Sequence, residues 1–386
     1  MNRLGCALVE IVATCFRVLP FPSKTGLIRI GQPGRDAPVF LTCNYRLTVQ
    51  RVRRALSGTD CYLLVANSRG VNVWCAATGG LMTNHDVISV LRTSGIEELV
   101  DQRQVILPQL AATGVERKVI QKKTGWRAIW GPADAKHIPD FIKNRFQNTP
   151  AMRRVSFPWP ARFEMAVAWA FPISLIAVLV VGLFWGQAVA AVIALVWGLS
   201  LAMFLGFPLY GRWLKTKKKR RGFILFDFGR VGLPWIVWGL FMLGCAAFAV
   251  GTGANTWGFF LRWGTVSLVV VFVLSIDLMG STPVYKSGLH EERLLEVVLD
   301  ESKCRGAGCC EQVCPANCFE VDRARHTATM PRAHACVQCG ACIVQCPCDA
   351  LCFKSPAGEI IPPETIRRFR LNMMGKRLVN VGDQRA

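Results

Sequence analysis

Four long apolar runs in the middle of this 386-residue chain limit what it can fold into. They cover residues 163–185, 187–209, 233–250 and 257–278, and each could cross a hydrocarbon core of about 30 Å as a helix. Little more than Gly186 separates the first two runs, and residues 251–255 separate the last two, which predicts two helical hairpins. Four consecutive runs favour a four-helix transmembrane region over 160–280, rather than buried helices of a soluble core.

The distribution of positive charge predicts the orientation of these helices. The link between the two hairpins, residues 211–222, is densely basic, whereas the links within the hairpins contain no lysine or arginine. The positive-inside rule places this basic loop in the cytoplasm, and an even number of spans leaves both flanking domains on the same side. We therefore expect a multi-pass protein of the cytoplasmic (inner) membrane with both soluble domains facing the cytoplasm.

The net charge of +21 is consistent with an anionic membrane surface as a partner. Much of this charge flanks the apolar runs and is not interleaved with aromatic residues on a soluble face. Nucleic acid is therefore not expected as a partner.

Four cysteines near the C-terminus follow a C-x2-C-x2-C-x3-C-P pattern: Cys336, Cys339, Cys342 and Cys346. This spacing is typical of bacterial ferredoxins, in which three thiolates bind one [4Fe-4S] cluster and the fourth reaches a second cluster. A zinc knuckle lacks third and fourth cysteines at such intervals. We therefore expect an α+β two-cluster ferredoxin domain over residues 295–356, which transfers electrons.

An altered copy of this pattern precedes it. Three of its cysteines keep the ferredoxin register: Cys304, Cys310 and Cys314. Ala307, however, stands where the second ligand is expected, which leaves two interpretations open. Either a [3Fe-4S] cluster forms with Cys346 as its third ligand, or Cys309 supplies the missing ligand of a [4Fe-4S] cluster. The last cysteine of this copy then completes the other [4Fe-4S] site.

Three further cysteines belong to neither pattern, and we expect them to pack as small hydrophobic side chains beside the clusters: Cys318, Cys348 and Cys352.

Short β-rich runs alternate with helical patterns over residues 38–150, which predicts a compact α/β domain with parallel strands. Strands are expected at 62–66, 71–74, 103–107 and 127–130, and helices at 85–92, 115–123 and 134–144. No glycine-rich dinucleotide fingerprint and no P-loop follows a strand, so neither kind of site is indicated. Residues 1–37 are expected to form an N-terminal amphipathic segment, and residues 357–386 a basic tail.

A lone cysteine, Cys75, ends an expected strand in the run Asn72-Val73-Trp74-Cys75-Ala76-Ala77. Composition alone favours a buried structural cysteine. A helix that begins soon after it could instead lower its pKa and make it a metal ligand.

This hexapeptide resembles the signature of the mercury-methylation corrinoid protein, whose domain is similar to the corrinoid-binding part of the corrinoid iron–sulfur protein. The resemblance extends to residues 41–45, 103–110 and 124–127, and the family continues into membrane spans. The C-terminal part is similar to the family's two-cluster ferredoxin partner, so the chain resembles a fusion of both. It diverges after Ala77, where residues 78–84 replace a lysine-containing turn, and it lacks the partner's C-terminal cysteine pair.

The resemblance implies a Rossmann-like corrinoid-binding domain in which residues 72–77 contact a base-off, cobalamin-type corrinoid and Cys75 is the lower axial ligand of cobalt. It implies membrane-anchored, corrinoid-dependent methyl transfer, with the ferredoxin reducing cobalt to Co(I) and mercury or a metalloid among the methyl acceptors. The implied partners are a methyl-donor methyltransferase or a methylated folate or pterin, and an upstream low-potential electron donor. Two alternatives are a membrane iron–sulfur electron-transfer protein without corrinoid and a metal- or metalloid-resistance protein.

Overall fold

The structure is a computed structural model that describes residues 10–17, 19–211, 233–253, 256–277 and 295–372. The chain divides into two compact units, one formed by residues 1–18 and 156–291 and the other by residues 19–155 and 292–386. The expected basic loop at 211–222 lies outside the described residues apart from Gly211, and so does the end of the expected basic tail. Of the expected N-terminal amphipathic segment, residues 10–15 are helical.

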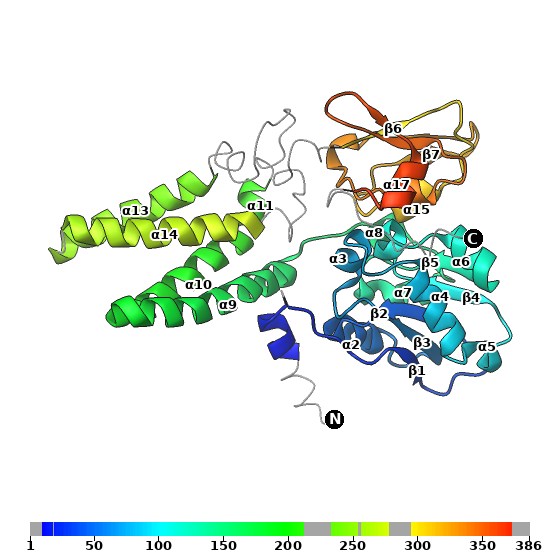
Figure 1. The fold of residues 1–386 in the computed structure, drawn as a ribbon, viewed down its shortest axis with the longest axis horizontal. Coiled ribbons are helices and arrows are strands. Elements are labelled where there is room, and N and C mark those ends of the chain that lie inside the picture. Colours follow the sequence, from blue (N-terminus) through cyan, green and yellow to red (C-terminus); the bar gives the residue numbers. More distant parts are fainter. Residues whose placement is uncertain (1–9, 18, 212–232, 254–255, 278–294, 373–386) are drawn as a thin grey trace. The chain divides into compact units, whose positions relative to one another are not determined.

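A five-stranded sheet forms the centre of the α/β domain (Figure 1). Its strands are β1 (Gly26–Ile30), β2 (Val39–Cys43), β3 (Cys61–Ala66), β4 (Gln104–Leu107) and β5 (Arg127–Trp130). They follow the order β1-β3-β2-β4-β5, in which β2, β3, β4 and β5 pair in parallel and β1 pairs antiparallel with β3. The expected α/β class with parallel pairing is therefore confirmed.

Helices cover both faces of this sheet. Phe40, Leu63 and Ile106 point to one face, where they share a core with α2 (Arg46–Ala55) and α7 (Ile138–Lys143). The alternate residues of the same strands are buried as well, so the opposite face is also covered. There α4 (Asn84–Thr93) packs on β3, and α6 (Arg117–Thr124) packs on β5. The remaining helices of this domain are short: α3 (Val73–Thr78), α5 (Ile96–Leu99), η1 (Gln109–Thr113), η2 (Ala135–His137) and α8 (Pro150–Arg153).

The structure differs from the expected elements at several places in this domain, and the buried strand β2 and the helix α2 were not among those expected. Residues 71–74 do not form a strand, because the side chain of Asn72 accepts a hydrogen bond from the backbone N–H of Cys75 and starts α3 at Val73. Strand β1 lies before residue 38, inside the segment expected to be amphipathic. It is an edge strand whose residues are mostly half-buried, so it lacks a strong apolar run.

The cysteine-rich C-terminal part contains a three-stranded antiparallel sheet, a β-hairpin and short helices. The sheet joins β6 (Glu296–Leu299), β9 (Leu351–Lys354) and β10 (Ile360–Ile361), and the hairpin joins β7 (Glu320–Asp322) and β8 (Thr327–Thr329). The helices are α15 (Cys309–Val313), η6 (Ala333–Ala335), α16 (Ala341–Gln345) and α17 (Pro363–Phe369). Regular structure therefore continues beyond residue 356, where the basic tail was expected to begin.

The two halves of this C-terminal part repeat each other at an offset of 32 residues in the sequence. Gly308 and Gly340, with φ of 71° and 75°, precede α15 and α16. Asn317 and Asp349, with φ of 50° and 52°, lie in the left-handed region after the two helices. The repeat places the two cysteine patterns in equivalent loops.

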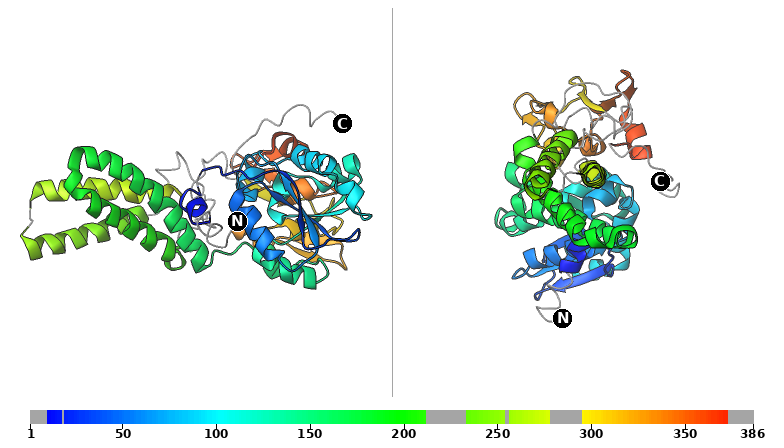
Figure 2. Two further views of the ribbon diagram at one scale, coloured as in Figure 1. Left: turned by 90° about the horizontal axis from the view of Figure 1, so that it is seen from below. Right: turned by 90° about the vertical axis from the view of Figure 1, so that its left-hand side faces the viewer.

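The other unit is helical and apolar (Figure 2). It contains α9 (Trp159–Trp185), η3 (Gly186–Ala188), α10 (Val189–Leu205), α11 (Phe207–Tyr210), α13 (Leu233–Thr252) and α14 (Trp257–Asp277). In the part of the chain that the structure describes, three helical segments are long and apolar enough to cross a membrane, judged by length and composition alone: Trp159–Leu205, Pro234–Thr252 and Trp257–Ser275. The first includes both α9 and α10, which pack against each other after the chain turns at η3.

Polar contacts join the helices of each pair in this unit. The Ser200 hydroxyl of α10 donates to the carbonyl oxygen of Ala166 in α9, at 2.9 Å. The indole N–H of Trp238 in α13 donates to the carbonyl oxygen of Gly264 in α14, at 3.0 Å. The helix pairing expected from the apolar runs is therefore present.

Candidate functional site

The loop that leads to Cys75 is organised by the buried side chain of Asn44, directly after β2. Its Oδ1 accepts hydrogen bonds from the backbone N–H and the hydroxyl of Ser68 and from the backbone N–H of Gly70, at 2.9, 2.8 and 2.9 Å. Gly70 has a φ of +72°, and a Cβ there would lie 2.6 Å from the backbone nitrogen of Pro22. The segment between β3 and α3 therefore has little freedom. Sequence analysis missed Asn44, because no spacing rule indicates a buried asparagine of this kind.

Cys75 lies in the first turn of α3 and is exposed. Its backbone N–H donates to Asn72 Oδ1 at 2.9 Å, and Asn72 Nδ2 lies 3.3 Å from its Sγ as a hydrogen-bond donor. The interpretation of Cys75 as a buried structural cysteine is therefore wrong. Asn72 both caps the helix and contacts the thiol of this exposed residue.

The structure divides the six expected cofactor-binding residues into two sets. Asn72, Trp74 and Cys75 lie towards the surface, whereas Val73, Ala76 and Ala77 are buried. The buried set packs α3 onto the domain, so its side chains are not available to a bound molecule. The hexapeptide therefore combines three packing positions with three positions that can contact a ligand.

α3 also lies at an edge of the sheet where ligands commonly bind. The strand order reverses between β2 and β4, and ligands of open α/β sheets bind outside the carboxyl ends of strands at such a switch point. Three buried polar atoms on segments at this edge have no hydrogen-bond partner within the described part of the chain: Gln109 Oε1, Thr113 Oγ1 and Trp130 Nε1. Buried polar atoms of this kind are uncommon and call for a partner. Together with the exposed thiol, they fit a large polar cofactor.

The segment η1 connects α3 to the cysteine-rich C-terminal part. It packs against α3 and against α16. On the α3 side, a Cβ at Gly114 would lie 2.4 Å from the carbonyl oxygen of Met82 and 2.9 Å from that of Ala77, so only glycine fits. On the α16 side, the buried amide of Gln345 donates hydrogen bonds to the carbonyl oxygens of Ala112 and Val115, at 2.8 and 2.7 Å.

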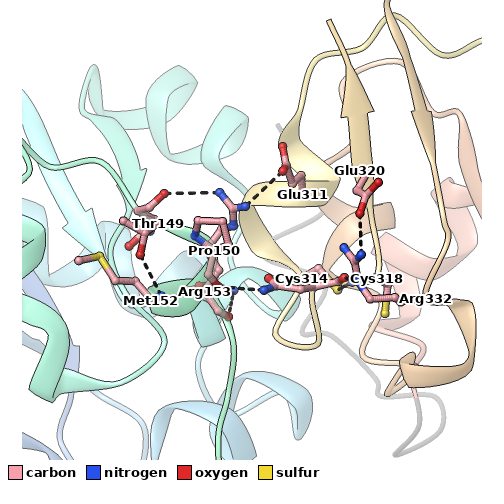
Figure 3. Close-up of polar contacts among 12 residues, drawn as sticks. Thr149, Pro150, Met152, Arg153, Glu311, Cys314, Cys318, Glu320 and Arg332 are labelled. Atoms are coloured by element: carbon pink, nitrogen blue, oxygen red, sulfur yellow. Dashed lines mark hydrogen bonds and ion pairs between the residues drawn. The ribbon is translucent and has the colours of Figure 1, made fainter.

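Further polar contacts join the C-terminal part to the α/β domain. Arg370, whose side chain is 4% exposed, forms an ion pair with Glu116 at 2.9 Å. Arg153 forms a second ion pair with Glu311 at 3.2 Å, shown in Figure 3. The side-chain amide of Asn372 donates to the carbonyl oxygen of Thr78, the last residue of α3, at 3.1 Å. These contacts fix the cysteine-rich part beside the helix that contains Cys75.

Four predicted cluster ligands lie together in the C-terminal part: Cys314, Cys336, Cys339 and Cys342. Burial raises the pKa of Cys339 and Cys342, and the neighbouring thiolates at 314 and 336 raise both pKa values further. Such thiols are costly to ionise side by side unless a cation binds them. The donor set therefore fits an iron–sulfur cluster.

Cys318 contacts this group, although it belongs to neither cysteine pattern. It is buried, as expected, and its backbone N–H donates to Cys314 Sγ at 3.2 Å. A side-chain hydrogen bond from Cys318 lowers the pKa of Cys314 to about 7. Cys318 thus stabilises a neighbouring thiolate as well as filling space.

The other predicted ligands line a pocket in the C-terminal part. Its cysteines are Cys304, Cys309, Cys310, Cys346 and Cys348, and Ala307 also lines it. Burial raises the pKa of Cys310 to about 12. Among the described residues, no three cysteine, histidine or acidic side chains form a group that could hold a single metal ion.

Comparison with known proteins identifies relatives of the α/β domain. The family model for the CO dehydrogenase/acetyl-CoA synthase delta subunit matches residues 12–142. The gamma subunit of the acetyl-CoA decarbonylase/synthase complex from Archaeoglobus fulgidus is 34% identical over 129 residues, which are 33% of this chain and 27% of that protein. The gamma subunit from Methanothermobacter thermautotrophicus is 35% identical over 119 residues, 30% of this chain and 26% of that protein. The chain thus spans about a quarter of the length of the curated relatives it matches.

These matches correct the sequence-based resemblance. The matched family and relatives are subunits of CO dehydrogenase/acetyl-CoA synthase and of acetyl-CoA decarbonylase/synthase, and not mercury-methylation proteins. The shared hexapeptide encodes a capped helix with two small buried residues, a local structure that does not depend on the methyl acceptor. Mercury methylation is therefore not retained as an interpretation.

The exposure of Cys75 predicts selective alkylation. At pH 8, iodoacetamide should modify Cys75 within minutes in the native protein, whereas Cys43 and Cys61 of the same domain should react only after unfolding. Burial raises the pKa of both internal thiols, that of Cys61 to about 12, so they stay protonated and inaccessible at this pH. Peptide mass spectrometry of samples taken at successive times measures the order in which the three cysteines are alkylated. Equal protection of all three cysteines would contradict the accessible position of Cys75.

Proposed function

We propose that this chain is a membrane-anchored, corrinoid-dependent methyl-transfer protein whose cysteine-rich part binds two iron–sulfur clusters and donates electrons to the corrinoid. The observation that carries the proposal is the buried amide of Gln345. It lies in the segment between two predicted cluster ligands, and it is hydrogen-bonded to η1, the segment that packs against the helix of Cys75. An electron-transfer part and a cofactor-ligand helix are thus connected through η1, in addition to the direct contact between Asn372 and Thr78.

Corrinoid binding is inferred from the sequence resemblance to the corrinoid iron–sulfur protein, and the family match over residues 12–142 supports it. A bound corrinoid would supply a cobalt centre that accepts and releases a methyl group. The chain's own contribution is to offer the exposed Cys75 thiolate as the ligand below cobalt, in a base-off mode. Asn72 fixes the orientation of the sulfur through its side-chain amide.

The cysteine-rich part supports a reducing role. A thiolate ligand stabilises oxidised metal centres, so reduction of the cofactor requires a low-potential donor nearby. Two groups of thiols on the same chain would bind the clusters that act as this donor. Because the clusters and the corrinoid are then carried by one chain, the effective concentration of the donor at the corrinoid is high. An upstream low-potential electron donor would in turn reduce these clusters.

Membrane anchoring is proposed from the surface of the helical unit. Its outward side chains are apolar and exposed, among them Leu183, Phe184, Val250 and Trp257, which are 80–92% exposed. A contiguous apolar surface of this kind is costly in water and is suited to lipid. With α9, α10, α13 and α14 as four spans and the loop at 211–222 on the inside, both cofactor-binding parts would face the cytoplasm.

The methyl donor is proposed to be a methyltransferase partner or a methylated folate or pterin. The named relatives are subunits of multi-protein complexes, which supports partner proteins for this chain as well. The alternative function, a membrane electron-transfer protein without corrinoid, makes no use of the exposed, oriented thiol of Cys75.

The proposed role of Cys75 predicts that its substitution impairs cobalt ligation and methyl transfer but leaves the iron–sulfur clusters intact. Protein purified from cells supplied with cobalamin should contain cobalt, and Cys75→Ala should abolish the sulfur-to-cobalt spectrum and lower methyl transfer at least 100-fold, on the scale expected for loss of a metal ligand. Iron content and iron–sulfur spectra should remain unchanged. Cys15→Ala, which removes a cysteine outside the candidate site, serves as the control. Iron without cobalt in the unmodified protein would favour the alternative.

The role of Gln345 predicts slower internal electron transfer. Gln345→Leu should leave the carbonyl groups of Ala112 and Val115 buried without donors, at a cost of about 1–3 kcal/mol to the docking of the C-terminal part. Stopped-flow absorption should show slower reduction of cobalt by pre-reduced clusters, and hydrogen exchange of residues 109–115 should increase. Gln147→Leu, which replaces an exposed glutamine of the α/β domain, is the matched control. Unchanged rates and exchange in Gln345→Leu would contradict the proposed route.

The proposed topology is tested with reporter fusions. A fluorescent protein that folds only in the cytoplasm should be active when fused after residue 217 and inactive when fused after residue 255. Alkaline phosphatase at the same two positions should show the opposite pattern. Activity of the cytoplasmic reporter at both positions, or recovery of the full chain in the soluble fraction without detergent, would overturn the membrane part of the proposal.

A further inference from the structure

The pocket beside Ala307 contains more thiols than a damaged cluster site requires. At the offset of 32 residues that relates the two halves, Ala307 corresponds to Cys339, so this half has lost one ligand. The pocket itself has two additional thiols, Cys309 from the first half and Cys348 from the second, and their counterparts at this offset are Ala341 and Ala316. Both additional thiols line the pocket with Cys304, Cys310 and Cys346. The added thiols are thus found at the site that lacks a ligand.

Cys309 is poorly placed to replace the missing ligand. It is adjacent to Cys310 in the first turn of α15, and the side chains of consecutive helical residues diverge by about 100°. Cys310 keeps the ligand register. The Sγ of Cys309 lies 3.5 Å from a guanidinium nitrogen of Arg117 in α6, at the contact with the α/β domain. The Sγ of Cys309 also donates to the carbonyl oxygen of Ala307, at 3.9 Å, a contact that a thiolate bound to iron could not make.

Cys348 is better placed. It follows Cys346 by two residues in the turn after α16, and both thiols line the pocket. The turn is held by Arg367, whose guanidinium donates to the carbonyl oxygen of Cys346 at 3.1 Å and pairs with Asp349 at 2.5 Å. Asp349 adopts a φ of 52°, which reverses the chain directly after Cys348. The backbone on both sides of Cys348 is therefore fixed next to the pocket.

We propose that Cys348 is the fourth thiolate ligand of this site, in place of the side chain that Ala307 lacks. With Cys304, Cys310 and Cys346 it completes a set that binds a [4Fe-4S] cluster instead of a [3Fe-4S] cluster. Each thiol releases its proton to solvent as its sulfur binds iron, and no change of oxidation state is needed. This inference rests on the proposed iron–sulfur function of the C-terminal part and is independent of corrinoid binding.

Iron analysis and electron paramagnetic resonance of the full chain, reconstituted anaerobically with iron and sulfide, test the ligand. The unmodified protein should contain about eight irons per chain and give no three-iron signal when oxidised. Cys348→Ala should contain about seven irons and give a three-iron signal, because one corner of the cluster loses its ligand. Cys309→Ala is the matched control and should retain about eight irons. The double variant Cys348→Ala with Ala307→Cys should regain the lost iron, which separates the loss of a ligand from the loss of folding.

Three results would overturn the inference: a three-iron signal in the unmodified protein, loss of iron in Cys309→Ala with Cys348→Ala unchanged, or failure of Ala307→Cys to restore the cluster. In each of these cases the protein still binds iron, so the proposed electron-transfer function stands. Absence of iron and sulfide from every variant would instead reject that function together with the inference.

Discussion

The hydrogen bonds of the Gln345 amide are the interaction on which the arrangement of the candidate sites depends. Both carbonyl groups that accept from it belong to the segment after β4, and the amide itself is buried, so water cannot replace it without cost. Gln345 directly precedes the predicted ligand Cys346 and follows Cys342 by three residues. The same short helix thus presents cluster ligands on one side and docks onto the α/β domain on the other. A displacement of the docking contact would therefore also displace the ligands.

The α/β domain fixes its own candidate ligand by comparable means. Parallel strands end at a common edge, and Asn44 uses one buried carboxamide oxygen to hold the loop that follows the neighbouring strand. That loop ends at Asn72, which starts α3 and orients the thiol of Cys75. The sulfur of an exposed cysteine on a surface helix would ordinarily adopt several positions, because its side chain can rotate. Here two asparagines and a glycine with positive φ determine where its sulfur lies.

Sequence patterns predicted the parts of this structure that depend on local periodicity. Buried strands such as β3 have continuous apolar runs, and the cysteine spacing placed the thiols in two groups, as the repeat at offset 32 shows. Edge strand β1 was missed because one of its faces is not fully covered, and β2 was missed although all five of its residues are buried. Residues 71–74 were taken as a strand because the capping role of Asn72 was overlooked. The resemblance to mercury-methylation proteins was wrong because a six-residue signature reports helix packing and not the methyl acceptor. The interdomain partners of Gln345, Arg370 and Arg153 join residues more than 150 positions apart, which no local pattern reveals.

The close approach at Gly114 has a consequence for how fast electrons could travel. With backbone oxygens so near that no side chain fits, η1 and α3 cannot slide past each other without a clash. They therefore form a closely packed segment between the thiol of Cys342 in α16 and the sulfur of Cys75. Electron tunnelling slows exponentially with distance, so in the proposed function this close packing would set the rate through the fold itself. A single methyl group added at Gly114 would force the backbone of α3 or of the segment that follows it to move, and with it the distance that the electrons would have to cross.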